Sequence, residues 1–266
     1  MIPRVLTIAG SDSGGGAGIQ ADLKTITALG GFGTSAITAL TAQNTCGVSR
    51  VVQVEPGFVA EQIDAVIKDI GADAAKTGML AGRAVIEAVA ECIRRHDIHP
   101  LVVDPVMVAA SGARLLEEDA LSAMRDLMLP LADVATPNLA EAEVLVGMRV
   151  GDESAMKEAA RRLHACGSRW VLVKGGHLPG EPVDVLFDGR DFREVRRPRV
   201  ATPNKHGTGC TYSAAIATGL AWGMDVPAAV EWARDAVQAG LKGALALGRG
   251  SGPLGHGALF GLPRPG

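Results

Sequence analysis

The chain has 266 residues, of which 47% are apolar, only 3% are aromatic and 34 are glycine. A chain of this length and apolar content can bury a large core, which excludes a disordered protein, a collagen-like repeat and a small disulfide-stapled protein. The formal net charge is −3, and no run of five like charges occurs, which argues against a nucleic-acid-binding surface.

Short β-branched runs alternate with amphipathic stretches along the whole chain. The runs predict strands at Val5–Ala9, Ser35–Leu40, Val51–Val54, Ala74–Lys76, Leu101–Val103, Val134–Thr136 and Trp170–Val173. The amphipathic stretches predict helices at Ala17–Leu29, Phe58–Ile70, Ala84–Arg95, Glu117–Leu129, Ala140–Val146, Glu153–Cys166, Thr208–Trp222 and Pro227–Leu247. Repeated strand–helix–strand order predicts an α/β fold with parallel strands and helices on both faces of the sheet. Because the composition does not shift and no linker or repeat is visible, we expect one domain over residues 1–266.

In such a sheet, ligands bind at the carboxyl ends of the strands. The first predicted strand is followed by the loop GSDSGGGAG, residues 10–18, and then by a helix that carries Asp22 and Lys24. A loop with so few side chains lets the backbone approach a ligand closely and leaves N–H groups available for an anion. The order is not that of a P-loop, and it matches the dinucleotide pattern GxGxxG only loosely. A tight turn without a ligand is the alternative.

Polar side chains end three further predicted strands. Asp104 follows Leu101–Val103, and Asn138 and Glu141 follow Val134–Thr136. These oxygen atoms suit Mg²⁺, although Asn138 and Glu141 have equally the spacing of a helix-capping box, and both interpretations stay open. Lys174 follows Trp170–Val173 and offers a cation to a phosphate.

A second glycine-rich segment, HGTGCT at residues 206–211, enters an alanine-rich helix. We expect the N–H groups of Gly207, Thr208 and Gly209 to face outward and stabilise an oxyanion. Cys210 lies in the first turn, where a thiol pKa below about 8.5 is expected, so it is a candidate base or nucleophile. The alternative is a small residue that packs the helix start. An anion site, an acidic pair, a lysine and a proton acceptor together match phosphoryl transfer.

The cysteines lie too far apart for the paired spacing of a zinc site. We expect Cys46, Cys92 and Cys166 to be packing residues with free thiols. The chain starts with a strand-like run rather than a signal peptide, and no apolar run reaches the roughly 18 residues of a membrane span, so we expect a cytoplasmic protein. The basic stretch Arg193–Arg199 alternates with Glu194 and Pro198 and predicts a solvated edge.

Seven runs carry a specific resemblance to a known family: AGSDSGGGAGIQADLKT, ITALTAQNT, KTGML, VVDPVM, TPNLAEAEVL, VKGGH and HGTGCT. In this order they resemble the bacterial hydroxymethylpyrimidine/phosphomethylpyrimidine kinases of thiamine synthesis, which are ribokinase-like. The resemblance extends from about Val5 to the C-terminal helices. It implies a ribokinase-like three-layer α/β/α sandwich with a mostly parallel sheet, ATP and Mg²⁺ as cofactors, and a homodimer. It also implies two ATP-dependent transfers, first to 4-amino-5-hydroxymethyl-2-methylpyrimidine and then to its monophosphate.

The resemblance assigns roles residue by residue. Residues that bind or enclose the pyrimidine are Gly10, Asp22, Gln43, Met79 and Val106. Residues that bind ATP and Mg²⁺ are Asn138, Lys174 and Thr208 for the nucleotide and Asp104 and Glu141 for the metal. Catalysis is assigned to Cys210 with Gly207, Thr208 and Gly209. A carboxylate and a carboxamide can read the adjacent donor and acceptor groups of an aminopyrimidine in pairs.

Two positions depart from the family pattern, because Ala110 stands where relatives often have Lys and Lys205 where Thr is common. Both flank the phosphate region and put the strength of ATP binding in question. A pyridoxal or pyridoxine kinase is the alternative within the fold, but Gln43 favours the aminopyrimidine, since Met is common there in pyridoxal-type relatives. A cysteine hydrolase using Cys210 and His206, and a nucleotide-binding module without catalysis, are alternatives of other classes.

Overall fold

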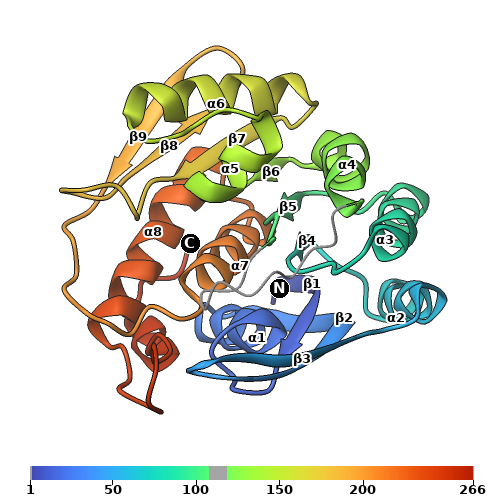
Figure 1. Ribbon diagram of the computed structural model, residues 1–266. Helices are drawn as coiled ribbons and strands as arrows, with labels where there is room; N and C mark the ends of the chain where they lie inside the picture. The colour runs from blue at the N-terminus through green and yellow to red at the C-terminus, as the bar shows by residue number, and fades with distance from the viewer. Residues whose placement is uncertain (1, 108–118, 266) are drawn as a thin grey trace.

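The computed structural model describes residues 2–107 and 119–265, and Ala110 therefore lies outside the described residues. Within them the chain forms a nine-stranded sheet in the order β3-β2-β1-β4-β5-β6-β7-β8-β9 (Figure 1). The strands are β1 (Arg4–Asp12), β2 (Phe32–Asn44), β3 (Gly47–Gln53), β4 (Ala74–Thr77), β5 (Leu101–Val103), β6 (Val134–Ala135), β7 (Trp170–Lys174), β8 (Val183–Phe187) and β9 (Phe192–Arg196).

The helices fall close to their predicted positions. They are α1 (Gly18–Ala28), α2 (Pro56–Asp69), α3 (Arg83–His96), α4 (Ala120–Ala123), α5 (Leu139–Val146), α6 (Glu153–Ala165), α7 (Thr208–Ala221) and α8 (Val226–Lys242), with the short segments η1 (Met124–Met128), η2 (Leu129–Leu131) and η3 (His256–Gly261). The predicted helix Glu117–Leu129 begins outside the described residues and continues as α4 and the π-helical η1. α8 ends before the predicted Leu247, because Gly243 caps it and a glycine-rich loop follows.

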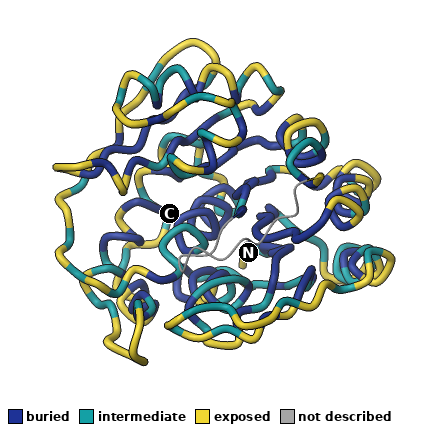
Figure 2. Tube along the Cα trace, in the orientation of Figure 1, coloured by how far each residue is buried: buried dark blue, intermediate teal, exposed yellow. Residues whose placement is uncertain are grey.

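Helices cover both faces of the sheet. α1, α7 and α8 share one apolar core with one face, and α2 to α6 share another with the opposite face (Figure 1). α7 is buried along almost its whole length, while the outer sides of α2, α3 and α6 are exposed (Figure 2). Both cores consist mainly of Val, Ile, Leu, Ala and Met, as the scarcity of aromatic residues requires. The three-layer α/β/α class is thereby confirmed.

The expectation of parallel strands holds for the six central strands and is wrong for β3. Only Thr45 and Cys46 separate β2 from β3, and a link that short permits only an antiparallel hairpin. β8 and β9 were not among the predicted strands and also pair antiparallel. β9 lies at the edge of the sheet, so the solvated edge predicted from Arg193–Arg199 is confirmed there.

The order of the strands reverses its direction beside β1. From β1 the chain moves to β2 on one side and later returns to pair β4 on the other, which makes β1/β4 the point where the direction of winding reverses. Parallel α/β sheets bind ligands at the carboxyl ends of such strands. Within the described residues no helix is long and apolar enough to cross a membrane.

Candidate active site

The first glycine-rich loop wraps around a carboxylate of its own. Asp12, the last residue of β1, accepts the N–H groups of Gly14 at 2.8 Å, Gly16 at 3.0 Å and Ala17 at 2.8 Å. Asp12 therefore occupies these three N–H groups, which are not available to an anion, whereas no side chain caps the start of α1 itself. His206 lies 2.9 Å from the same carboxylate through Nε2, which ties the loop to the segment before α7.

The second glycine-rich segment packs directly on the first. Gly207 has φ +87°, and a Cβ there would overlap the carbonyl of Gly16, so only glycine fits. No side chain caps α7, which leaves its first turn to a ligand, although the N–H of Thr208 donates to the Lys205 carbonyl at 3.2 Å. Thr208 is therefore not the outward donor that was expected. The helix start still has the positive end of its dipole at the sheet edge.

Asp104, which is buried, and Lys174, which is mostly buried, form an ion pair under the start of α7. Lys174 Nζ lies 2.8 Å from Asp104 Oδ1, and the Ser213 hydroxyl donates to Oδ2 at 3.2 Å. A Cβ built on Gly209 would lie 3.4 Å from Lys174 Nζ and 3.8 Å from Asp104 Oδ2, so Gly209 stands directly over the pair. The structure thus brings the ends of β5 and β7 and the glycines of α7 together, as an anion site requires.

Asp104 and Lys174 each stabilise the charged form of the other. Burial alone would raise the pKa of Asp104, but Lys174 and Lys76 lower it below its usual value. Burial alone would lower the pKa of Lys174, but Asp104 and Glu141 raise it above its usual value. The site therefore holds a carboxylate and an ammonium at neutral pH.

Asn138 and Glu141 form the capping box of α5. The Asn138 side chain accepts the N–H of Glu141 at 3.0 Å, and the Glu141 carboxylate accepts the N–H of Asn138 at 2.8 Å. Burial and the nearby Asp104 raise the pKa of Glu141 to about 7, although Lys174 opposes them. The capping interpretation is confirmed, and the position of Glu141 beside Asp104 and Lys174 leaves the metal-binding prediction open as well.

Cys210 is not the acidic thiol that its helix position suggests. Burial, with Asp22 and Asp104 nearby, raises its pKa to about 11, although Lys76 and the N–H of Gly18 favour the thiolate. The helix dipole contributes only a few tenths of a unit charge and is outweighed by loss of solvent. Among the other thiols Cys92 is buried as expected, but Cys46 is exposed at the tip of the β2–β3 hairpin, so its packing role is wrong.

Asp22 lies inside the protein with no exposed area and pairs with Lys76, which is equally buried. Lys76 Nζ lies 3.0 and 2.9 Å from the two carboxylate oxygens, and the Thr7 hydroxyl donates to one of them at 2.7 Å. Lys76 was not predicted as a site residue. Its signal in the sequence is a lysine within the short apolar strand β4, whose carboxyl end lies on the same side of the sheet as the other polar strand ends.

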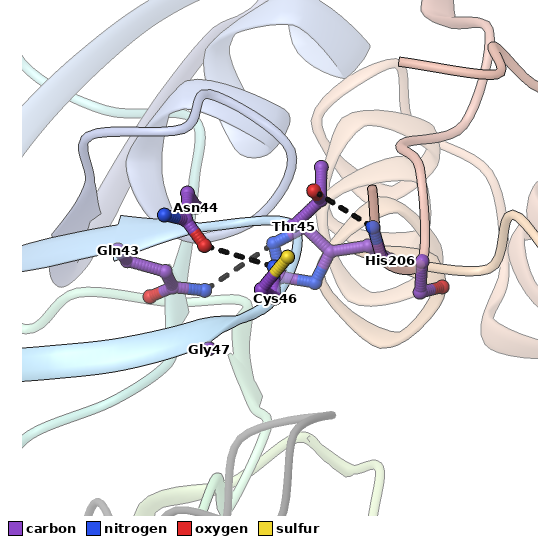
Figure 3. Close-up of a pocket in the computed structure, with 8 residues that line it drawn as sticks. Gln43, Asn44, Thr45, Cys46, Gly47 and His206 are labelled. Atoms are coloured by element: carbon purple, nitrogen blue, oxygen red, sulfur yellow. Dashed lines mark hydrogen bonds between the residues drawn. The ribbon is translucent and has the colours of Figure 1, made fainter. Parts of the chain in front are cut away.

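The remaining predicted pocket residues fall in two groups. Met79 packs with Ala39 and Val106, and a Cβ on Gly10 would lie 3.1 Å from the Met79 sulfur, so these residues are together. Gln43 lies further along β2 and lines a cavity of about 400 Å³ with the hairpin tip, His206 and Ser251 (Figure 3). His206 is thus a site residue that sequence reasoning considered only for a hydrolase. Lys205 is exposed, and its N–H contacts the Ser251 hydroxyl at 3.2 Å.

No three His, Cys, Asp or Glu side chains within residues 2–107 and 119–265 gather closely enough to hold a metal alone. Mg²⁺, however, commonly uses one or two carboxylates and completes its shell with water and substrate phosphates. Asp104 and Glu141, both buried and both near Lys174, fit that requirement.

The sequence matches one family model and many curated proteins. The model described as phosphomethylpyrimidine kinase matches residues 12–255. The thiamine biosynthesis bifunctional protein ThiED of Geobacter sulfurreducens is 53% identical, over 95% of this chain and 52% of that protein. The hydroxymethylpyrimidine/phosphomethylpyrimidine kinase of Streptomyces coelicolor is 49% identical, over 97% of this chain and 96% of that protein. The chain therefore spans about half the length of the bifunctional relative and nearly all of the other.

The fold matches solved kinases. An ADP complex of Bacillus subtilis pyridoxal kinase superposes with a TM-score of 0.91 at 38% identity, over 97% of this chain and 99% of that one. The phosphomethylpyrimidine kinase of Clostridium difficile superposes with a TM-score of 0.80 at 40% identity, over 89% of this chain and 98% of that one.

Proposed function

The chain belongs to the phosphomethylpyrimidine kinase family, and on that premise we propose that it transfers phosphoryl groups from ATP to 4-amino-5-hydroxymethyl-2-methylpyrimidine and then to the resulting monophosphate. The observation that carries this proposal is the Asp104–Lys174 ion pair beneath Gly209, where the start of α7 meets the ends of the parallel strands. Such a site combines a fixed cation with a helix start that favours negative charge.

Different residues of the site act in the two transfers. In the first, the Cys210 thiolate takes the proton of the hydroxymethyl group while the hydroxymethyl oxygen attacks the γ-phosphorus and the bond to ADP breaks, so that ADP leaves. In the second, the acceptor is already an ionised phosphate, so the first turn of α7 and Lys174 stabilise the charge without a base. Lys174 faces the transferred group in both transfers, held in place by Asp104.

Asp104 and Glu141 would hold Mg²⁺, directly or through water, with Asn138 and Thr208 near the nucleotide phosphates. The ion would neutralise phosphate charge when bound. The two carboxylates fit this role because they are buried beside one lysine, while the phosphates and water supply the other ligands.

The test is an ATP-consumption assay with the pyrimidine alcohol, its monophosphate and pyridoxal, with products identified by mass. We expect the monophosphate from the first compound and the diphosphate from the second. The variant Cys210→Ala should reduce the first transfer far more than the second. Equal losses would reject the base role, and no product from either pyrimidine would reject the function.

Pyridoxal phosphorylation is the second candidate, because the Bacillus subtilis pyridoxal kinase superposes with the higher TM-score of the two structures described above. Gln43 separates the candidates, since its carboxamide suits the donor and acceptor edge of an aminopyrimidine. The variant Gln43→Met should lose activity on the pyrimidine alcohol and keep or gain activity on pyridoxal. An unchanged ratio of the two activities would remove Gln43 from the specificity site.

We also propose that the chain works as a cytoplasmic homodimer of single-domain subunits. Leu40 of β2 and Val52 of β3 pair across the hairpin and are both exposed, which supports an apolar contact there. Sedimentation should give twice the mass of one chain, and a monomer at micromolar concentration would contradict the dimer. Fractionation of the source cells should recover the enzyme with the cytoplasmic proteins.

A further inference from the structure

Asp12, Thr41, Gln43 and His206 form one polar network, in which Gln43 and His206 line the cavity of Figure 3. His206 Nε2 lies 2.9 Å from Asp12 Oδ2 and 3.3 Å from Gln43 Nε2. On its other side, the Gln43 carboxamide lies 3.2 Å from the Thr41 hydroxyl through Oε1. Thr41 in turn donates to the Ser11 carbonyl at 2.9 Å.

Asp12 decides where the hydrogen of His206 lies. Burial alone would raise the pKa of Asp12, but the hydrogen bonds from His206, Ala17 and Gly14 lower it below its usual value. Asp12 is therefore a carboxylate and can only accept hydrogen bonds. An imidazole nitrogen 2.9 Å from a carboxylate oxygen must carry a hydrogen, so His206 Nε2 is a donor.

The donor on His206 fixes one end of the Gln43 side chain. A carboxamide nitrogen is also a donor, and two donors facing each other make no hydrogen bond. Because the oxygen and nitrogen of a carboxamide are almost equal in size, the surrounding network determines which of them faces His206. Only the carboxamide oxygen can accept the hydrogen on His206 Nε2, and that hydrogen is then shared between Gln43 and Asp12.

The Thr41 hydroxyl favours the same orientation at the other end of the Gln43 carboxamide. The hydroxyl has one hydrogen and two candidate acceptors, the Ser11 carbonyl at 2.9 Å and Gln43 Oε1 at 3.2 Å. When the hydrogen goes to the nearer Ser11 carbonyl, the hydroxyl acts toward Gln43 as an acceptor. The carboxamide NH₂ then faces Thr41. Two independent constraints, one at each end, select a single orientation in which every donor of the network meets an acceptor.

We propose that His206 and Thr41 act as positioning residues that lock the Gln43 carboxamide in this orientation and thereby set the specificity of the pyrimidine site. One N–H and one oxygen lone pair of Gln43 remain for the ligand in a fixed order. A ring binds when its amino group faces the Gln43 oxygen and its adjacent ring nitrogen faces the Gln43 N–H. A ring with these two groups exchanged leaves a polar group unpaired. This role rests on the proposed function, because it assumes that Gln43 contacts the substrate.

The network can be tested without substrate by ¹⁵N NMR of the imidazole groups in the full-length enzyme. The His206 signals are identified by their loss in His206→Gln. We expect Nε2 to carry a hydrogen. An unprotonated Nε2 would overturn the proposed orientation, whatever the enzyme phosphorylates.

The effect on specificity is tested by calorimetric binding of the pyrimidine alcohol to two matched variants. Thr41→Val removes the acceptor with little change of shape and should raise the Kd about fivefold, the worth of one hydrogen bond. Thr41→Ser keeps the hydroxyl and should bind as the parent does. ATP affinity should stay near the parent value in both variants, while Thr41→Val should also lower the melting temperature modestly, because the Ser11 carbonyl loses its hydrogen bond.

The possible results are distinct. Equal pyrimidine affinity in the parent, Thr41→Val and Thr41→Ser would overturn the specificity role, as would a loss of ATP affinity parallel to that of the pyrimidine. A parent enzyme that fails to bind the pyrimidine would overturn the proposed function and the specificity role together, while the NMR result still tests the hydrogen on His206 Nε2 that the orientation of Gln43 requires.

Discussion

Cys210 illustrates how burial governs the chemistry of a single side chain. With its pKa raised to about 11, on the order of one thiol in ten thousand is ionised at neutral pH. Burial and two nearby buried carboxylates, Asp22 and Asp104, raise the pKa, whereas the Lys76 ammonium and the N–H of Gly18 oppose them. A raised pKa makes the Cys210 thiolate a stronger base, but it also leaves a smaller fraction of the thiol ionised.

The first transfer should therefore accelerate with pH. Below a pKa of about 11 the thiolate fraction rises about tenfold per pH unit, so kcat/KM for the pyrimidine alcohol should rise steadily from neutral to alkaline pH. The second transfer, which needs no base, should not follow this rise. Rate profiles for both substrates provide the measurement, with Cys210→Ala as the control that abolishes the slope. A pH-independent first transfer in the parent would contradict the base role.

The Lys76–Asp22 pair should matter for stability as well as for the site. Both side chains are fully buried, so removing one leaves an unpaired charge inside the protein. We expect Lys76→Met to lower the free energy of unfolding by about 3–5 kcal/mol, measured by urea denaturation. Lys68→Met, the same change in the exposed Lys68–Asp64 pair, should leave the transition near that of the parent.

The double variant Lys76→Met with Asp22→Asn checks the cause of this loss. It removes the unpaired charge and should recover part of the stability. A double variant less stable than Lys76→Met alone would show that the uncompensated Asp22 charge is not what destabilises the protein.

At the scale of elements, the start of α5 serves two purposes through one residue. Glu141 completes the capping box and also places a carboxylate beside Asp104 and Lys174. A capping box alone needs only a hydrogen-bond acceptor at this position, whereas a metal ligand needs a charge. The two roles can therefore be separated by a variant that keeps the acceptor and removes the charge.

Glu141→Gln should raise the Mg²⁺ concentration required for half-maximal activity while the unfolding free energy changes by less than about 1 kcal/mol. In the parent, the requirement for Mg²⁺ should grow as pH falls below about 7, because the raised pKa protonates the carboxyl there. Metal titrations at several pH values measure this effect, and the variant should show less of it. A stability loss without any change in Mg²⁺ requirement would assign Glu141 to capping alone.

At the scale of the whole molecule, one sheet connects all parts of the described chain. The central strand β1 comes from the N-terminus, and the edge strand β9 comes from the C-terminal half. α7 packs against β1, β4 and β5, so the helix that carries Cys210 rests on strands that are distant in sequence. The two apolar cores therefore share the sheet between them.

Unfolding should accordingly be a single cooperative transition. Trp170, Trp222 and Trp232 report on the C-terminal half by fluorescence, and circular dichroism reports on the helices of both halves. The two signals should give the same urea midpoint, as expected for one domain. A fluorescence transition separate from the dichroism transition would divide the chain into two units.

The sequence by itself determined the alternation of strands and helices, the aliphatic core and the edge of the sheet where the polar residues gather. These features depend on local periodicity and on the sequential order of elements, which short segments already express. It also indicated the capping box of Asn138 and Glu141 as one of two interpretations, since that contact spans only three residues.

Only the tertiary structure decided the features that join distant segments. β8 forms a strand by pairing with β7, and β9 forms a strand by pairing with β8. The partner of Asp22 lies 54 residues away, and His206 reaches Asp12 across 194 residues. The pKa of Cys210 likewise follows from burial and from charges on other elements, which outweigh the helix start that the local sequence shows. Desolvation and long-range charge pairing arise only when the chain is packed.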